Sequence, residues 1–474
     1  MNIRFDNTYA KLPERFYHAQ PPLSVRAPGL IRVNHGLAEQ LGISAEWLES
    51  EEGIKVLAGN SVPEGAEPIA TVYAAHQFGN WNPQLGDGRA LLLGEVLSTT
   101  GERFDVQLKG SGPTPYSRGG DGLAPLGPVL REYIVSEAMH TLGVPTSRSL
   151  AAVTTGEPTM RETVQPGAVL TRVASSHIRI GTFQFFAARS DTEALVALAD
   201  HVMDRHYPEA RESSEPYRAL LGAVIEKTAT LVSHWQQLGF IHGVMNTDNM
   251  LVCGETVDYG PCAFMDVYHP EQVFSSIDTA GRYAYQNQPD IAHWNLANFA
   301  QCLLPLLADS EAAAIDVAKA ELDKFPGVFY EHHRRGMAQK LGLDTPSETS
   351  DGLTQDLLSL MATEQQDYTL TFSRLGQSLA AGQLTALPEA FVDWFSNWQS
   401  NAPDGQLMKA INPVIVPRNH QVEAVIQAAL EADFEPFHNL VDALKNPYLA
   451  SLVDSPYAQP PEDHEVVQRT FCGT

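Results

Sequence analysis

Two residues that can bind a divalent cation lie on neighbouring segments in the middle of the chain. Asn249 ends a polar segment, and Asp258 follows it by nine residues, with apolar positions between them. An amide oxygen and a carboxylate on adjacent loops can hold a hard cation against nucleotide phosphates. For each residue alone, capping of a turn is the simpler interpretation. Their joint spacing favours a metal site that would bind Mg²⁺, with Mn²⁺ as an alternative.

The residues around this pair resemble the catalytic segment of phosphoryl-transfer enzymes. His242 precedes Asn249 by seven residues, and Asp258 begins the sequence Asp-Tyr-Gly. Protein kinases have His-Arg-Asp, then Asn, then Asp-Phe-Gly at this spacing. The kinase catalytic Asp would stand two residues after the His, where this chain has Val244, which cannot accept a proton. Asp248 is the only carboxylate in the loop and is the candidate proton acceptor.

Candidate phosphate ligands precede this loop. Lys109 ends an alternating, strand-like segment, and Glu132 lies 23 residues later near the start of a helical segment. Such a lysine can contact phosphate while the glutamate holds it in place. The turn 86–89, with Gly86, Gly88 and Arg89, has the composition of a short phosphate loop whose backbone N–H groups could approach oxygens.

Arg172 and Arg179 interrupt an apolar segment. A buried guanidinium is costly unless it is paired, so both residues are candidates for binding a polyphosphate. A structural salt bridge, or a side chain that reaches the surface, explains them equally well.

Secondary-structure patterns divide the elements that must position these residues into two groups. Strand patterns cover residues 89–97, 104–110, 149–154 and 168–173, a Gly/Pro-rich loop covers 110–128, and a helix is expected at 129–142. Further helices are expected at 193–206, 216–238, 291–307 and 310–324. Strands followed by helices indicate an α+β, two-lobed fold. We expect an N-terminal extension at 1–68 with one helix at 38–50, lobes at 69–173 and 174–340, a helical region from 341, and a flexible or draped tail at 454–474.

Composition limits the possible partners. The 474 residues include 31 Lys and Arg against 57 Asp and Glu, a formal charge of −26 that disfavours nucleic acid and anionic membranes as partners. No signal-like start or long apolar run is present, and the four cysteines do not form a disulfide framework or a zinc motif. A cytoplasmic location is therefore expected.

Several motifs together resemble the selenoprotein O family of protein adenylyltransferases over nearly the whole chain. The matching segments are 5–7, 76–79, 86–90, 107–118, 131–133, 136–139, 242–250, 258–261 and 281–283. The resemblance implies a protein-kinase-like fold that binds ATP in a reversed orientation and transfers AMP to Ser, Thr or Tyr hydroxyls of proteins. It further implies that Asp248 is the proton acceptor and that Asn249 and Asp258 hold the metal. Nucleotide contacts would come from Gly86, Gly88, Arg89, Lys109, Asp121, Gly122, Arg172 and Arg179.

This chain also departs from the family pattern. Leu123 stands where relatives usually have Arg, and Ser176 and His177 replace a proline and an aromatic residue. The resemblance implies a redox-active tail cysteine, here Cys472. The activation-segment cysteine expected near Phe274 is absent, and Cys262 could take its place as a disulfide partner. Cys253 and Cys302 are expected to be buried thiols.

Two other functions remain open at this point. The chain could be a small-molecule phosphotransferase with Asp248 as base, although Val244 argues against it. It could also be an ATP-binding scaffold without turnover.

Overall fold

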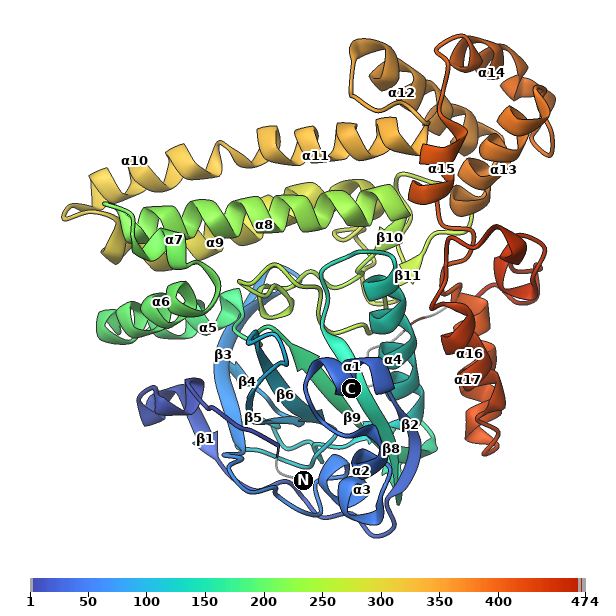
Figure 1. Cartoon of the computed structure of the whole chain (residues 1–474). Helices are drawn as coiled ribbons and strands as arrows, with labels where there is room; N and C mark the ends of the chain where they lie inside the picture. Colours follow the sequence, from blue (N-terminus) through green and yellow to red (C-terminus); the bar gives the residue numbers. More distant parts are fainter. Residues whose placement is uncertain (1–2, 468–469, 471–474) are drawn as a thin grey trace.

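The computed structural model describes residues 3–467 and 470, and it combines a large antiparallel sheet with a mainly helical second half (Figure 1). Nine strands form the sheet in the order β1-β3-β5-β6-β9-β8-β2, with β4 paired to β3 and β7 paired to β9. The strands are β1 Tyr17–Ala19, β2 Gly29–Val33, β3 Ile69–Gln77, β4 Asn80–Gly86, β5 Ala90–Leu97, β6 Arg103–Lys109, β7 Ala124–Pro125, β8 Arg148–Met160 and β9 Val164–Ala174. The predicted strands correspond to β5, β6, β8 and β9. Strands β8 and β9 are longer than predicted and extend beyond the predicted apolar segments as a hairpin.

The N-terminal 68 residues are integrated into this sheet. They contribute β1 and β2, the first and last strands in the order of the sheet, which pair with β3 and β8. The single helix expected at 38–50 is wrong. Three short helices replace it: α1 His35–Gln40, α2 Ala45–Leu48 and α3 Glu51–Leu57. Gly42 takes a left-handed φ of 69° after α1, and the side chains of Ser44 and Ser50 cap the next two helices, so the chain turns at each point.

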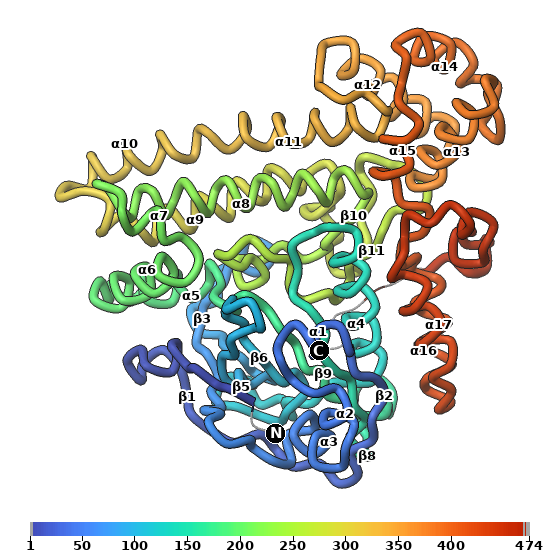
Figure 2. Tube along the Cα trace, in the orientation of Figure 1, coloured from blue at the N-terminus to red at the C-terminus, as the bar shows by residue number. Residues whose placement is uncertain are grey.

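Helix α4 (Leu126–Thr141) packs on strands β8 and β9 and carries Glu132. It begins three residues before the predicted helix, directly after β7. On its far side lie α16 (Asn419–Leu430) and α17 (Glu435–Ala443), as Figure 2 shows. Apolar side chains from these helices and from the sheet share one core, which fixes the position of α4.

The helical half is built around α8 (Pro216–Leu238). Pro216 starts this helix, and Gly239 ends it with φ 68°. Helices α9, α10 and α11 pack along α8 (Figures 1 and 2). Helix α5 packs on both α9 and strand β3, and α6 packs against α5 and α7. The helices up to α11 are α5 Ile180–Ala187, α6 Thr192–His206, α7 Pro208–Arg211, α9 Gln288–Leu307, α10 Glu311–Leu322 and α11 Phe325–Lys340. Beyond them follow α12 Glu348–Thr363, α13 Tyr368–Ala381, α14 Val392–Gln399 and α15 Gly405–Ile411.

Irregular segments join the two halves. The short strands β10 (Phe240–Ile241) and β11 (Ala263–Phe264) pair with each other and bracket the loops that contain Asn249 and Asp258. Thr470, in the C-terminal tail, forms a bridge with Ser275 and exchanges hydrogen bonds with Ser276, so this part of the tail is draped over the segment after β11. Within residues 3–467, each helix is too short or too polar to cross a bilayer.

Candidate functional site

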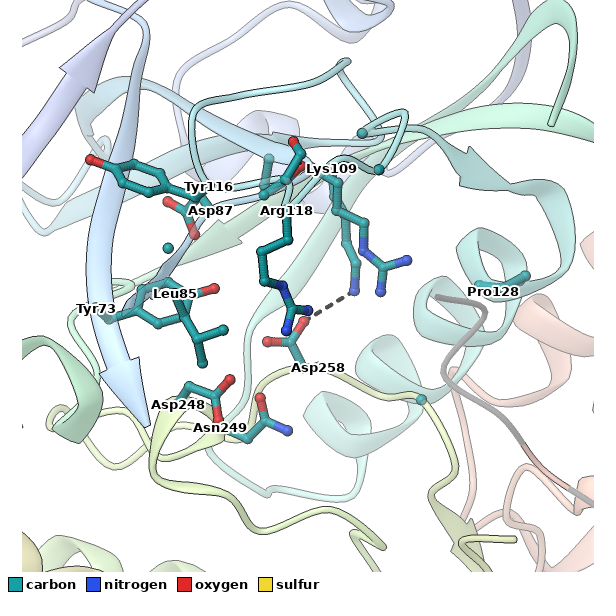
Figure 3. A pocket seen from close by; sticks show the side chains of 18 of the residues that line it. Tyr73, Leu85, Asp87, Lys109, Tyr116, Arg118, Pro128, Asp248, Asn249 and Asp258 are labelled. Atoms are coloured by element: carbon teal, nitrogen blue, oxygen red, sulfur yellow. Dashed lines mark hydrogen bonds and ion pairs between the residues drawn. The ribbon is translucent and has the colours of Figure 1, made fainter. Parts of the chain in front are cut away.

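A cavity of about 830 Å³ lies where the sheet meets the loops between β10 and β11 (Figure 3). Its lining includes every residue that the sequence singled out for ATP, base or metal. These residues are Gly86, Gly88, Arg89, Lys109, Asp121, Gly122, Glu132, Arg172, Arg179, Asp248, Asn249 and Asp258. They come from distant parts of the chain, so their convergence is a property of the fold.

Lys109 and Arg172 project from the neighbouring strands β6 and β9 toward the same carboxylate on α4. Glu132 accepts a hydrogen bond from Lys109 Nζ at 2.5 Å and one from Arg172 Nε at 2.7 Å. The side chains of Glu132 and Arg172 are only 3% and 2% exposed. Arg172 therefore does not reach the surface. Together the two cations hold the pKa of Glu132 below its usual value, although burial alone would raise it.

Asp258 is the second carboxylate of this cluster and the point where its cations meet. Its Oδ1 atom lies 3.0 Å from Lys109 Nζ and 2.6 Å from Arg172 Nη2, and its Oδ2 atom lies 3.0 Å from Arg179 Nη1. Burial opposes ionisation, but the three cations prevail and hold the pKa of Asp258 well below its usual range. The residue has a left-handed φ of 63°, which Asp tolerates better than most residues.

Arg179 extends the cationic cluster toward the loop that contains Asp248. Its Nη1 atom also donates to the Asp248 carbonyl at 2.6 Å, and its guanidinium stacks over the Tyr73 ring at 4.9 Å. Arg172 and Arg179 thus form structural ion pairs and also line the cavity. A structural salt bridge and a place in the cavity, which the sequence left as alternatives for these two arginines, are therefore compatible.

His242 and Val244 shape the loop that carries Asp248 and Asn249. The His242 ring is buried beside Trp235, with Nε2 2.9 Å from the Val257 carbonyl, so it supports the loop from beneath. The Val244 carbonyl accepts a 2.9 Å hydrogen bond from the amide of Asn249, which fixes the orientation of that side chain.

Asp248 has two differently placed carboxylate oxygens. Its Oδ2 atom accepts a hydrogen bond from Gln77 Nε2 at 3.1 Å. Its Oδ1 atom is buried and has no hydrogen-bond partner among the described residues. Burial raises the pKa of Asp248 to about 6, although Arg179 acts in the opposite direction.

The oxygen atoms near Asn249 and Asp258 suit a hard cation. The amide nitrogen of Asn249 is used by Val244, and Asp248 Oδ1 lacks a partner. Residues 3–467 contain no cluster of three or more His, Cys, Asp or Glu side chains that could enclose a metal. Mg²⁺ commonly takes one or two protein oxygens and completes its shell with water and substrate phosphates. The residues present therefore fit Mg²⁺ bound together with a phosphate ligand.

The turn at residues 86–89 packs against the Gly-rich loop that follows β6. A side-chain carbon on Gly86 would lie 2.4 Å from Cγ of Tyr116, and Gly86 has a φ of 151°. The hydroxyls of Thr114 and Ser117 donate to the carbonyls of Asp87 and Gly88. The two segments therefore form a single wall of the cavity.

Two backbone N–H groups of this turn already have partners within the protein. The N–H of Asp87 donates to the Thr71 carbonyl at 2.9 Å, and the N–H of Gly88 donates to the Gly86 carbonyl at 2.7 Å. These two groups are not available to phosphate oxygens. The glycines are needed because Tyr116 packs closely against the turn.

Asp121 and Gly122 lie at the rim, where Arg161 from the β8–β9 hairpin fixes them. Arg161 binds both oxygens of Asp121, at 2.8 and 3.1 Å, and donates to the Leu123 carbonyl at 2.9 Å. Arg161 thus brings a positive charge to the loop in which Leu123 stands where the family resemblance leads us to expect arginine. Arg161 was missed because no local pattern links it to a loop 40 residues away.

Other lining residues also escaped prediction as site residues, among them Tyr73, Gln77 and Arg118. Gln77 and Arg118 stand inside segments that carry the family resemblance, which was the available signal. His177, one of the departures, is held by Asp105 through its backbone N–H and its Nδ1 atom and is not part of the lining.

Cys262 is buried and does not line the cavity. Its expected partner, Cys472, lies outside the described residues. Cys302 is buried as expected, whereas Cys253 is partly exposed and donates to the Ser176 carbonyl.

Three cations gather beside oxygen atoms suited to a hard metal, and such a grouping of charges suits a polyphosphate ligand. Comparison with known proteins gives the family. The family model described as "Protein adenylyltransferase SelO" matches residues 1–445. Proteins named "Protein nucleotidyltransferase YdiU" are similar over the full length. The one from Rhodopseudomonas palustris (strain BisB5) is 55% identical over 490 residues, covering 100% of both chains. The one from Nitrobacter hamburgensis is 54% identical over 487 residues, covering 100% of this chain and 96% of the relative.

The chain belongs to the SelO family, and it is an enzyme of the nucleotidyltransferase class.

Proposed function

We propose that this enzyme transfers AMP from ATP to Ser, Thr or Tyr hydroxyls of other proteins and releases pyrophosphate. The observation that carries the proposal is the convergence of Lys109, Arg172 and Arg179 on Asp258, while Val244 occupies the position of a kinase base. Three cations suit a departing pyrophosphate, whose negative charge grows in the transition state. The relatives' name, protein nucleotidyltransferase, supports a protein acceptor.

Each part of the cavity has a role in this proposal. Gly86, Gly88, Arg89, Asp121 and Gly122 bind the nucleotide at the wall and rim. Glu132 holds Lys109 and Arg172 in place for the phosphates. The orientation of ATP is reversed relative to protein kinases, so that its α-phosphorus, and not the γ-phosphorus, faces Asp248.

Asn249 and Asp258 would hold Mg²⁺, or alternatively Mn²⁺, which when bound neutralises phosphate charge and makes the α-phosphorus more electrophilic. The acceptor oxygen forms a bond to the α-phosphorus as the bond from that phosphorus to the β-bridging oxygen breaks. The electron pair leaves with pyrophosphate, and the proton of the acceptor hydroxyl passes to Asp248. The partnerless Oδ1 atom of Asp248 supports this role.

The fold we propose is protein-kinase-like and two-lobed, with additional C-terminal helices. It is supported by the antiparallel sheet beside α4, by the pairing of Lys109 with Glu132, and by the spacing of the loops after β10. The lobes would be residues 69–173 and 174–340. We also propose that the enzyme acts in the cytoplasm and that Cys262 and Cys472 form a redox pair.

The decisive experiment compares ATP labelled at the α-phosphate with ATP labelled at the γ-phosphate. The pure enzyme is incubated with a protein extract and Mg²⁺, and label in protein is measured after gel separation. We expect label from the α position only. Label from the γ position only would make the enzyme a kinase, and label from neither position would favour the scaffold.

Two variants test the assignment of the base. Asp248→Ala should slow transfer by about 10²- to 10⁴-fold, the usual contribution of a general base. Asp316→Ala is the matched control, because Asp316 is an exposed carboxylate on α10. Equal activity of the two variants would contradict the role of Asp248.

A further inference from the structure

The end of strand β3 is fastened to the loop that carries Asp248. Three consecutive residues of the β3–β4 hairpin bond to three consecutive residues of that loop. The bonds run from His76 N to Thr247 Oγ1 at 2.8 Å, from Gln77 Nε2 to Asp248 Oδ2 at 3.1 Å, and from Phe78 N to Asn246 Oδ1 at 3.0 Å. Such a set of bonds fixes the hairpin and the loop relative to each other.

The turn of this hairpin has an unusual backbone that the contact with the loop requires. Phe78 and Gly79 both have positive φ angles, 50° and 80°. A left-handed conformation is costly for a residue with a side chain, and it persists where the surroundings impose it. The Phe78 ring packs against Tyr283, whose hydroxyl donates to the same Asn246 oxygen at 2.8 Å. The turn is therefore held from two sides.

Gln77 is the member of this set that reaches the proposed base, and it also lines the cavity. Its amide occupies Oδ2 of Asp248 and leaves Oδ1 without a partner. The backbone of Asp248 is anchored separately, because its carbonyl accepts from Arg179 at 2.6 Å. With the backbone fixed, Gln77 determines how the carboxylate is rotated.

We propose that Gln77 is a positioning residue for the transfer reaction: it orients the Asp248 carboxylate so that Oδ1 faces the acceptor hydroxyl. This inference rests on the proposed function, in which Asp248 accepts the proton. The same hairpin ends at Gly86, in the wall of the nucleotide cavity. One rigid unit thus connects the nucleotide wall to the base.

Replacing Gln77 with leucine keeps the approximate side-chain size and removes the hydrogen-bond donor. A misoriented base loses part of the about 10²- to 10⁴-fold that it contributes, so we expect the single-turnover rate at saturating ATP to fall about 10- to 100-fold. The ATP dissociation constant, measured by calorimetry, should stay within about twofold, because Gln77 acts on the base and not on the phosphates. Gln84→Leu is the matched control on the same hairpin, since Gln84 is exposed and does not line the cavity.

A double-mutant cycle distinguishes this inference from the proposed function. If Gln77 acts through Asp248, Gln77→Leu should cause no further loss when added to Asp248→Ala. The same loss in both backgrounds would overturn the inference and leave Asp248 as the base. Full activity of Asp248→Ala would instead overturn the proposed role of Asp248. A Gln77→Leu variant that weakens ATP binding as much as it slows transfer would also overturn the inference, whatever the cycle gives.

Discussion

Replacing Asp258 with asparagine removes the charge on which three cations converge. Lys109, Arg172 and Arg179 lie 2.6 to 3.0 Å from its carboxylate. Glu132 also pairs with Lys109 and Arg172, and Asp87 lies 4.0 Å from Arg179. Asparagine preserves the shape of the side chain and accepts the left-handed φ of 63°. The substitution therefore isolates the electrostatic contribution, whereas alanine would add a backbone penalty of about 1 kcal/mol.

The expected loss is about 2 kcal/mol in the free energy of unfolding of the ligand-free enzyme. Removing one partner of a fully buried ion pair costs about 3 to 5 kcal/mol. The loss here should be smaller, because the Asp258 side chain is 25% exposed and Lys109 and Arg172 keep Glu132 as a partner. The cations hold the pKa of Asp258 well below its usual value, so the carboxylate stabilises the fold above the pKa of an unfolded aspartate. The difference between the two proteins should stay constant from neutral pH to about pH 5 and shrink only below about pH 4.

Urea unfolding at 25 °C measures this difference as a shift in midpoint at constant slope. Asp316→Asn is the control for loss of one exposed carboxylate. AMP transfer by the Asp258→Asn variant should fall by at least about 100-fold, because a ligand of the proposed metal is lost as well. A variant as stable as the wild type, or more stable, would refute the reasoning, since it would mean that the three cations gain nothing from the carboxylate.

Three further predictions concern other parts of the structure. Gly86→Ala should destabilise the enzyme by about 3 kcal/mol in urea unfolding, because its new carbon would lie 2.4 Å from the Tyr116 ring; an unchanged midpoint would contradict the packing argument. Arg161→Ala should raise the ATP dissociation constant by up to about fivefold without changing the melting temperature, since it frees Asp121 at the rim; unchanged affinity would mean that this tether does not matter. Burial and a neighbouring arginine lower the pKa of His206 to about 3, so the unfolded chain binds a proton more readily below about pH 6.5 and stability falls as the pH drops. His206→Gln should reduce the decrease in the free energy of unfolding with falling pH by up to about 1.4 kcal/mol per pH unit. If the stabilities of the wild type and the variant fall in parallel with pH, His206 does not contribute to the decrease.

Local sequence patterns predicted much of the secondary structure and several of the residues that line the cavity. The long helix α8 lies between Pro216 and Gly239, whose preferences act within one turn of the chain. The loops that carry Asp248, Asn249 and Asp258 were found from residue types and their spacing, because the chemistry is concentrated in a short segment. Arg172 and Arg179 stood out because charges in apolar segments need partners, and Lys109 stood out because it ends an alternating strand 23 residues before Glu132.

Only the tertiary structure decided which of these residues meet. Asp258 binds Lys109 and Arg172 because β6 and β9 are neighbours in the sheet, which periodicity along one strand cannot indicate. The edge strands β1 and β2 have short, mixed patterns, so their places depend on pairing with β3 and β8. Contacts such as that of Gln77 with Asp248 join positions 171 residues apart. Local propensity acts over a few residues, whereas the choice of partner at such separations depends on how the whole core packs.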